Sequence, residues 1–281
     1  VYMGINESDY DWMVRKYDAD GILDTSWGTS GYVFYGSPVA NERLHDFTID
    51  SDESLYMAGE VADMWMIRKY DSSGSLVTGW GTSGYIAFGV GSTNEPEGIV
   101  VDADKNIYVA GDYRHGVNDS GWMTRKYDAD GILDTSWGGG KGFMVFAEGG
   151  RDHYAEDIIL NPDRSIFVGG YYDNPSNMDW MVRKYDADGA TSTDWGTNGV
   201  VVYNDAFDAD YVYGIVADSN EALYVVGFYA EEWSNSHGWM VRKYTGKTAV
   251  PYGKVDISGS TGTITFATSS NYSVATTTDF I

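Results

Sequence analysis

Trp12-Met13-Val14-Arg15-Lys16-Tyr17-Asp18, followed by Trp27-Gly28, is the stretch of sequence that decides the fold. The block returns four times, at residues 65–71, 122–128, 180–186 and 239–244, and the leading tryptophans stand 53 to 59 residues apart. Five such units account for all 281 residues. A self-similar period of this length predicts one supersecondary unit per repeat, with the units stacked into one body.

The second repeat shows the content of one unit. It has four short runs rich in Tyr, Ile and Met, separated by Asp, Ser and Gly, at residues 44–50, 54–59, 64–70 and 85–88. These runs predict four strands. Four antiparallel strands repeated radially predict an all-β, five-bladed β-propeller that forms a single domain over 1–281. Its repeats are expected at about 1–40, 41–94, 95–152, 153–207 and 208–260.

The two ends of the chain suggest how such a ring closes. Residues 1–4 (VYMG) match 55–58 (LYMA), so the first repeat begins at its second strand. Residues 272–275 (YSVA) resemble the inner strand at 213–216 (YGIV). We therefore expect 261–281 to close the first blade, with the N- and C-terminal strands in the same blade, which removes a free edge. The same strand given to a neighbouring copy would build a homo-oligomer or filament.

The charge and the composition of the chain exclude several classes of partner. Asp and Glu number 42 against 18 Lys and Arg, for a net charge of −24. So acidic a protein repels phosphates, so no nucleic-acid partner is expected. The sequence has no apolar run long enough for membrane insertion, and cysteine is absent. The chain opens at Val1 without a signal peptide, which suggests a processed or truncated form.

The connection between the third and fourth strands carries a family resemblance. The run YDADGILDTSWG occurs at 17–28 and again at 127–138, with LYMAG at 55–59. These runs resemble the delta-sixty repeat of bacterial surface β-propellers, with Trp in place of that family's Phe. The resemblance implies a non-catalytic, prokaryotic structural or binding module, extracellular or on the cell surface, and self-assembly there is an expected extension of that role.

The repeated residues have a physical interpretation of their own. A blade packed between two others has both faces of its sheet covered, so the five Trp and five Met are expected in the core between blades. The repeated arginines are expected to pair with nearby aspartates, and a cationic ring that binds an anion is the alternative. They are Arg15, Arg68, Arg125, Arg183 and Arg242. The glycines after the second tryptophan are expected to adopt a positive φ.

The aspartate-rich connections are candidate metal sites. Three carboxylates stand at relative positions one, three and seven in two repeats, as Asp18, Asp20 and Asp24 and as Asp128, Asp130 and Asp134. Ca²⁺ prefers six to eight oxygen ligands that include several carboxylates. Asp-Gly sequences also form turns stabilised by the aspartate's own hydrogen bonds. Both interpretations, a Ca²⁺ site and a plain turn, follow from the sequence.

Loops that differ between the repeats are the expected place for recognition. They carry aromatic and histidine side chains suited to stacking on a sugar and bonding its hydroxyls: His115, Phe207, Trp233 and His237. A glycan-binding, lectin-like propeller is therefore the first alternative function.

A polysaccharide-cleaving glycosidase is the second alternative. Such an enzyme needs two carboxylates at a fixed separation. Acids on the predicted inner strands, directed at the central channel, are Asp46, Glu97, Glu156 and Asp157. Because these acids recur at equivalent positions of different repeats, they also fit a solvated channel lining. We expect that the protein is not an enzyme.

Overall fold

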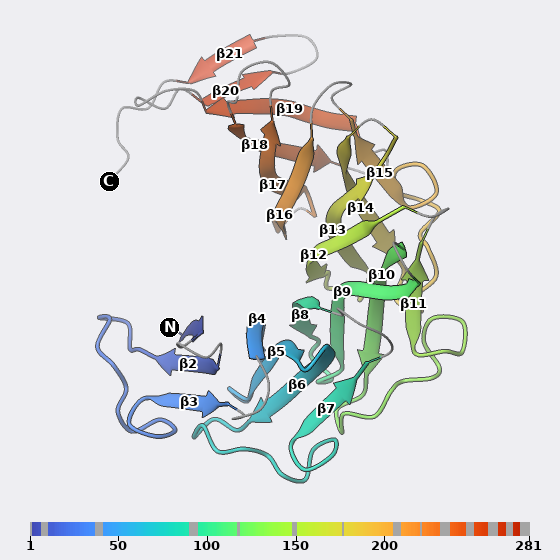
Figure 1. Ribbon diagram of the computed structural model, residues 1–281. Helices are drawn as coiled ribbons and strands as arrows, with labels where there is room; N and C mark the ends of the chain where they lie inside the picture. Colours follow the sequence, from blue (N-terminus) through green and yellow to red (C-terminus); the bar gives the residue numbers. More distant parts are fainter. Residues whose placement is uncertain are drawn as a thin grey trace. The chain divides into compact units, whose positions relative to one another are not determined.

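The computed structural model describes the protein strand by strand (Figure 1). The described residues are 2–6, 11–36, 42–89, 95–116, 119–147, 151–175, 177–204, 209–219, 221–230, 237–245, 250–257, 264–267 and 272–275. They form two compact units, Val1–Gly150 and Arg151–Ile281, which are described separately below. In this part of the chain no helix is long and apolar enough to cross a membrane.

The first unit contains three antiparallel sheets, one for each of the first three repeats. The first sheet has three strands, and the other two have four strands each. In chain order the strands are β1 (Tyr2–Asn6), β2 (Trp12–Lys16) and β3 (Tyr32–Tyr35); β4 (Glu42–Ile49), β5 (Leu55–Val61), β6 (Met64–Tyr70) and β7 (Tyr85–Phe88); and β8 (Pro96–Val101), β9 (Ile107–Gly116), β10 (Asp119–Tyr127) and β11 (Phe143–Phe146).

The second unit contains one sheet of four strands and one of six, here called the fourth and fifth sheets. The fourth consists of β12 (His153–Leu160), β13 (Ile166–Asp173), β14 (Met178–Tyr185) and β15 (Val200–Tyr203). The fifth consists of β16 (Asp210–Ala217), β17 (Leu223–Ala230), β18 (His237–Thr245), β19 (Val250–Ile257), β20 (Ile264–Ala267) and β21 (Tyr272–Ala275).

The strand prediction for the second repeat is confirmed, since its four runs are β4 to β7 in sequential antiparallel order. The predicted positive φ of the glycine after the second tryptophan is also confirmed, with φ of 57° at Gly28 and 53° at Gly81. Repeated four-stranded antiparallel sheets make the protein all-β and are consistent with a β-propeller. That the whole chain is a single body stays a prediction.

The C-terminal strand forms a hairpin with the strand before it. β21 pairs with β20 in the fifth sheet, and β1 pairs with β2 in the first. That residues 261–281 also close the first blade stays a prediction. Only residues 268–271 separate β20 from β21 along the chain. A short hairpin of this kind closes at a much lower entropic cost than a pairing between the two ends of the chain.

The tryptophan of the repeated block is the main packing element between neighbouring sheets. In the first unit Trp12 is fully buried against β5, where a Cβ atom on Gly59 would lie 2.5 Å from its ring. In the second unit Trp180 of the fourth sheet lies against Gly227 of the fifth in the same way, at 2.9 Å. At both glycines the atom closest to such a Cβ is a carbonyl oxygen of the paired inner strand, that of Arg43 or Tyr211, so the inner-strand backbone and the indole ring together leave no room for a side chain.

The repeated arginines differ from the predicted pairing with aspartates. The guanidinium of Arg68 lies 4.0 Å from the centre of the Tyr35 ring, and that of Arg125 lies 3.6 Å from the centre of the Phe88 ring. Each contact joins one sheet to the outer strand of the preceding sheet. A planar, weakly hydrated guanidinium is well suited to an aromatic face. The lysines that follow these arginines form the ion pairs with aspartates instead, as in the Lys126–Asp134 pair at 2.9 Å.

Candidate functional site

The inner strands of four sheets share a β-bulge, and the bulge sets the direction of their polar residues. The register shifts between Leu44 and Asp46 in β4, and the corresponding shifts occur in β8, β12 and β16. A bulge re-aims one side chain and is frequent beside binding sites. The bulged residues at the four equivalent positions are His45, Glu97, Glu156 and Tyr213.

Two of the predicted channel acids join neighbouring sheets. Asp46 accepts a hydrogen bond of 2.9 Å from the backbone N–H of Ile99 on β8, in the first unit. Asp157 accepts one of 2.8 Å from the N–H of Ile215 on β16, in the second. Burial raises the pKa of Asp46, while the hydrogen bonds that Asp46 accepts from the backbone N–H groups of Ile99 and Phe47 oppose the rise. The two acids lie in different units and each is engaged by backbone, as expected of structural side chains.

Glu97 belongs to a compact polar cluster in the first unit. His45 Nδ1 lies 2.9 Å from Glu97 Oε2, and the Arg43 guanidinium lies 3.8 Å from Glu95. Burial alone would lower the pKa of His45, but the hydrogen bond and charge of Glu97 outweigh it, so the pKa is raised. Burial, and then the charge of Glu95, raises the pKa of Glu60. The cluster therefore concentrates negative charge in a half-buried place.

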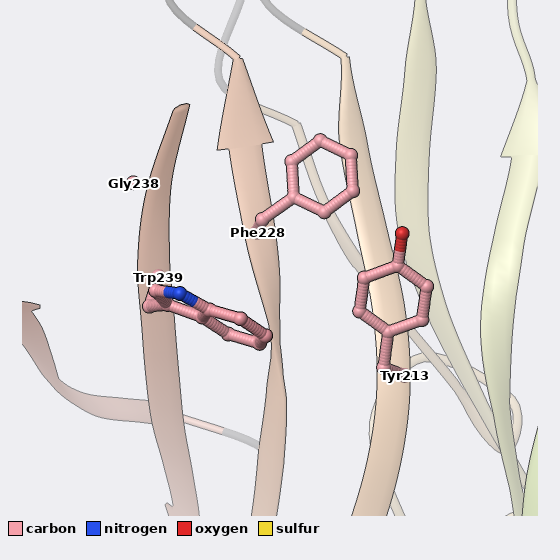
Figure 2. Close-up of a pocket in the computed structure, with 4 residues that line it drawn as sticks. All are labelled: Tyr213, Phe228, Gly238 and Trp239. Atoms are coloured by element: carbon pink, nitrogen blue, oxygen red, sulfur yellow. The ribbon is translucent and has the colours of Figure 1, made fainter. Parts of the chain in front are cut away.

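The second unit carries an open aromatic surface instead of a charged one. Tyr213, Phe228 and Trp239 lie side by side on β16, β17 and β18 and, with Gly238, line a pocket of about 330 Å³ (Figure 2). Phe228 is directly opposite Trp239 in the register, and its ring centre lies 5.5 Å from that of Tyr213. We call these three side chains the aromatic face of the fifth sheet.

Trp239 is the exception among the five repeated tryptophans, all of which were predicted to be core. It is 58% exposed, and Tyr213 beside it is 53% exposed. The exposures of the other four are 0% for Trp12, 2% for Trp65, 1% for Trp122 and 1% for Trp180. Trp180 is covered by the fifth sheet, the following sheet of its own unit. In the described part of the second unit no following sheet covers Trp239, and the core prediction is not met there.

The predicted glycan-binding residues cannot be compared with this surface. Phe207 and Trp233 lie outside the described residues. His115 and His237 lie within β9 and β18, where the structure describes the backbone alone. The aromatic face contains none of the four, and no feature of the repeat distinguishes Trp239 from its buried counterparts.

The aspartate-rich connections are turns whose carboxylates bind their own backbone. Asp18 Oδ1 accepts hydrogen bonds from the N–H groups of Asp20 and Ile22, at 3.0 and 2.8 Å. Asp128 does the same in the third repeat, with the N–H groups of Asp130 and Ile132. This arrangement is an Asx turn. In the described chain these triplets are not among the groups of close metal-ligating atoms, and Ca²⁺ binding by them stays a prediction.

The lysine–aspartate pairs of these connections predict a dependence of stability on pH. Hydrogen bonds from Lys126 and Ser136 hold the pKa of Asp134 below its ordinary value of 3.8. A lowered folded-state pKa stabilises the fold above 3.8, and that stabilisation is lost as the pH falls through the folded value. Asp134→Asn is expected to cost about 0.5 kcal/mol at neutral pH, as partly exposed ion pairs do.

The measurement is urea unfolding of Asp134→Asn and of the original protein at neutral pH and near pH 2, where the difference should vanish. Asp130→Asn is the matched control, because Asp130 lies in the same turn but is exposed, and it should change little at either pH. A difference that persists undiminished in acid would show that the Asp134 carboxylate is not its source.

The fold and these sites define a class of protein: an all-β repeat protein with the sheets of a β-propeller. Neither a family model nor a curated protein matches the chain. Among solved structures the chain is similar to a catalytically inactive virginiamycin B lyase from Staphylococcus aureus with quinupristin, at 12% identity. That similarity covers 95% of this chain and 91% of the other, with a TM-score of 0.40, and it carries no argument about activity.

Proposed function

We propose that the protein is a non-catalytic, extracellular structural module of five β-propeller blades whose ring stays open, so that the chain self-associates through the aromatic face of its fifth sheet. The observation that carries the proposal is the exposure of Trp239, at 58% against 0–2% for its four counterparts. The five sheets, one per repeat, support five blades. The resemblance of the repeat to bacterial surface propellers supports a place outside the cell.

The buried tryptophans show what this face is suited to contact. Trp12 and Trp180 each lie under the adjacent sheet of the same unit, against a glycine that leaves room for the indole ring. Removing an aromatic side chain from water contributes about 25 cal/mol per Å² of apolar surface. Contiguous exposed aromatic side chains mark an interaction surface. A second protein surface on Trp239 would complete the packing that the other tryptophans already have.

A second copy of the chain is the partner that we propose, with the two aromatic faces against each other. Contact between identical faces is isologous and closes at two copies, whereas contact between different faces continues into a filament.

The absence of catalysis is part of the proposal. Its support is that Asp46 and Asp157, two of the four candidate acids, accept backbone hydrogen bonds from the neighbouring inner strand. A general acid or a nucleophile must instead face the substrate. Glu97 is likewise engaged, by His45.

Light scattering of the purified chain over a range of concentrations tests the association. We expect the mass of a dimer, and the mass of one chain for Trp239→Ala at the same concentrations. Phe34→Ala is the matched control, because Phe34 is an aromatic side chain 47% exposed on the first sheet, and it should remain dimeric. A single-chain mass at every concentration, or masses that grow beyond two copies, would contradict the face-to-face dimer.

Glycan binding is the second candidate function, favoured by the form of the aromatic pocket. An open pocket of about 330 Å³ lined by Tyr213, Phe228 and Trp239 has the flat rings on which the apolar face of a sugar stacks. The test is binding to a panel of immobilised polysaccharides. Binding that is lost in both Tyr213→Ala and Trp239→Ala would support this candidate, and a panel without any bound member would remove it.

A further inference from the structure

A second site lies in the first unit, outside the aromatic face and independent of the proposed association. His45, Glu95 and Glu97 bring one ligand atom each to within 4.8 Å of one another. In the part of the chain that the structure describes, this is the one group of three histidine or acidic side chains with that geometry. The side chains of His45 and Glu97 are only 15% and 19% exposed, so the group is not a chance gathering of surface acids.

The backbone builds this group. His45 and Glu97 are the bulged residues of adjacent inner strands, β4 and β8, and each bulge turns its side chain out of the regular alternation. Glu95 is fixed by its carbonyl, which accepts a 2.8 Å hydrogen bond from the N–H of Asp112. Two of the ligating side chains thus come from adjacent strands whose register is held by ladder hydrogen bonds, and the third comes from Glu95, the residue before β8.

The distances suit a small metal ion. Ligands about 2.1 Å from a tetrahedral Zn²⁺ lie roughly 3.4 Å from one another. His45 Nδ1 and Glu97 Oε2 are 2.9 Å apart, and no pair of the three ligand atoms exceeds 4.8 Å. Small side-chain rotations are therefore enough to place one nitrogen and two carboxylate oxygens around an ion. Three protein ligands leave a fourth position for water, as in open zinc sites.

The charge of the surrounding side chains also favours a bound cation. Three carboxylates lie together, those of Glu60, Glu95 and Glu97, and Arg43 supplies one positive charge at 3.8 Å from Glu95. An ion bound at Nδ1 displaces the proton that His45 shares with Glu97, so the metal-bound site has a neutral imidazole, three negative charges and one positive charge, which leaves two negative charges for the ion to balance. In addition, Nε2 of His45 is buried and makes no hydrogen bond within the described structure. A dication would balance the charge and orient the imidazole.

The equivalent bulges do not repeat this arrangement. In the second unit the corresponding positions are Glu156 on β12 and Tyr213 on β16. The aromatic pairs Tyr154–Tyr171 and Tyr211–Phe228 stand where the first unit has the acids and Arg43. The ligating set therefore occurs at the junction of β4 with β8 in the first unit and not at the equivalent junction of β12 with β16 in the second.

We propose that His45, Glu95 and Glu97 bind one divalent transition-metal ion, with imidazole Nδ1 and two carboxylates as ligands. An imidazole with carboxylates suits Zn²⁺ and excludes the soft ions that require thiolates. The ion joins the inner strands of the second and third sheets. Its role is structural, since it ties β4 to β8 beside the Asp46–Ile99 hydrogen bond.

Isothermal titration of the metal-free full chain with Zn²⁺ is the test. We expect one ion per chain, and binding at least about tenfold weaker in Glu97→Gln and Glu95→Gln, because the loss of a ligand costs no less than the loss of an outer partner. Glu156→Gln is the matched control, since it makes the same change at the same bulge position of β12, and it should bind as the original protein does. Asp128→Asn should also be unchanged, which separates this site from the aspartate-rich turns.

A second measurement keeps the proposal testable if the variants fail to fold, as circular dichroism would show. Co²⁺ added to the original protein should develop visible d–d absorption and broaden the ring signals of His45 in a proton–nitrogen spectrum. The proposal is overturned if Zn²⁺ does not bind, if folded Glu97→Gln binds it unchanged, or if Co²⁺ leaves the His45 signals as they were.

Discussion

Trp180→Ala is expected to lower the free energy of unfolding by about 3–5 kcal/mol, as removal of a fully buried large aromatic side chain does. Trp180 is 1% exposed and its ring lies against Gly227 of the next sheet. The same change at Trp239, which is 58% exposed, is expected to cost less than about 1 kcal/mol in the dissociated chain, as surface substitutions do. The measurement is urea unfolding of both variants at a concentration below that of association.

The comparison is matched because both residues begin the same sequence block and both lie on the third strand of a four-strand repeat. Trp180→Phe, which keeps part of the apolar volume, should fall between the original protein and Trp180→Ala. Equal losses at the two tryptophans would mean that Trp239 is packed like the others, and the argument for an open face would be wrong.

Asp157→Ala is expected to cost about 3 kcal/mol, because a carboxylate that accepts two backbone hydrogen bonds leaves buried donors unpaired when it is removed. Asp157 accepts from the N–H of Ile215 at 2.8 Å and from the N–H of Ile158 at 2.7 Å. Ile215 and Ile158 are almost completely buried, so water does not readily replace the lost partner. Thermal unfolding followed by circular dichroism measures the effect.

Asp46→Ala should behave in the same way, since Asp46 is the equivalent residue of the second repeat and bonds Ile99. Glu156→Gln, adjacent to Asp157 on β12, is the control and should change stability much less. If Asp157→Ala were as stable as the original protein but lost a polysaccharide-cleaving activity, the acid would be catalytic and the structural assignment would fail.

The repeat made most of the fold predictable from the sequence. Short apolar runs between Asp, Ser and Gly gave β4 to β7 directly, and the invariant glycine after the second tryptophan gave the positive φ at Gly28. Both are local effects of backbone preference, repeated often enough to be unambiguous. The pairing of β21 with β20 was not predictable in this way, because the similarity of 272–275 to an inner strand gives no information on which edge it joins.

The candidate site was predictable only in part. Glu97 was predictable as an inner-strand acid, but its grouping with His45 and Glu95 was not, since the bulges that direct His45 and Glu97 are a property of strand pairing. Asp46 and Asp157 were placed on the correct strands, yet their backbone partners belong to the next repeat. The exposure of Trp239 was not predictable from the sequence, because the burial of this side chain depends on the neighbouring sheet and not on its own strand.

The central claim is that Trp239 is exposed in the single chain and buried on association. Oxidative footprinting of the five repeated tryptophans by mass spectrometry tests it most directly, because the method measures the solvent exposure of each indole ring. In the dilute single chain we expect Trp239 to be oxidised and Trp12, Trp65, Trp122 and Trp180 to be protected. At concentrations where the mass doubles, Trp239 should become protected as well. Protection of Trp239 in the dilute chain, or its continued oxidation in the dimer, would contradict the account.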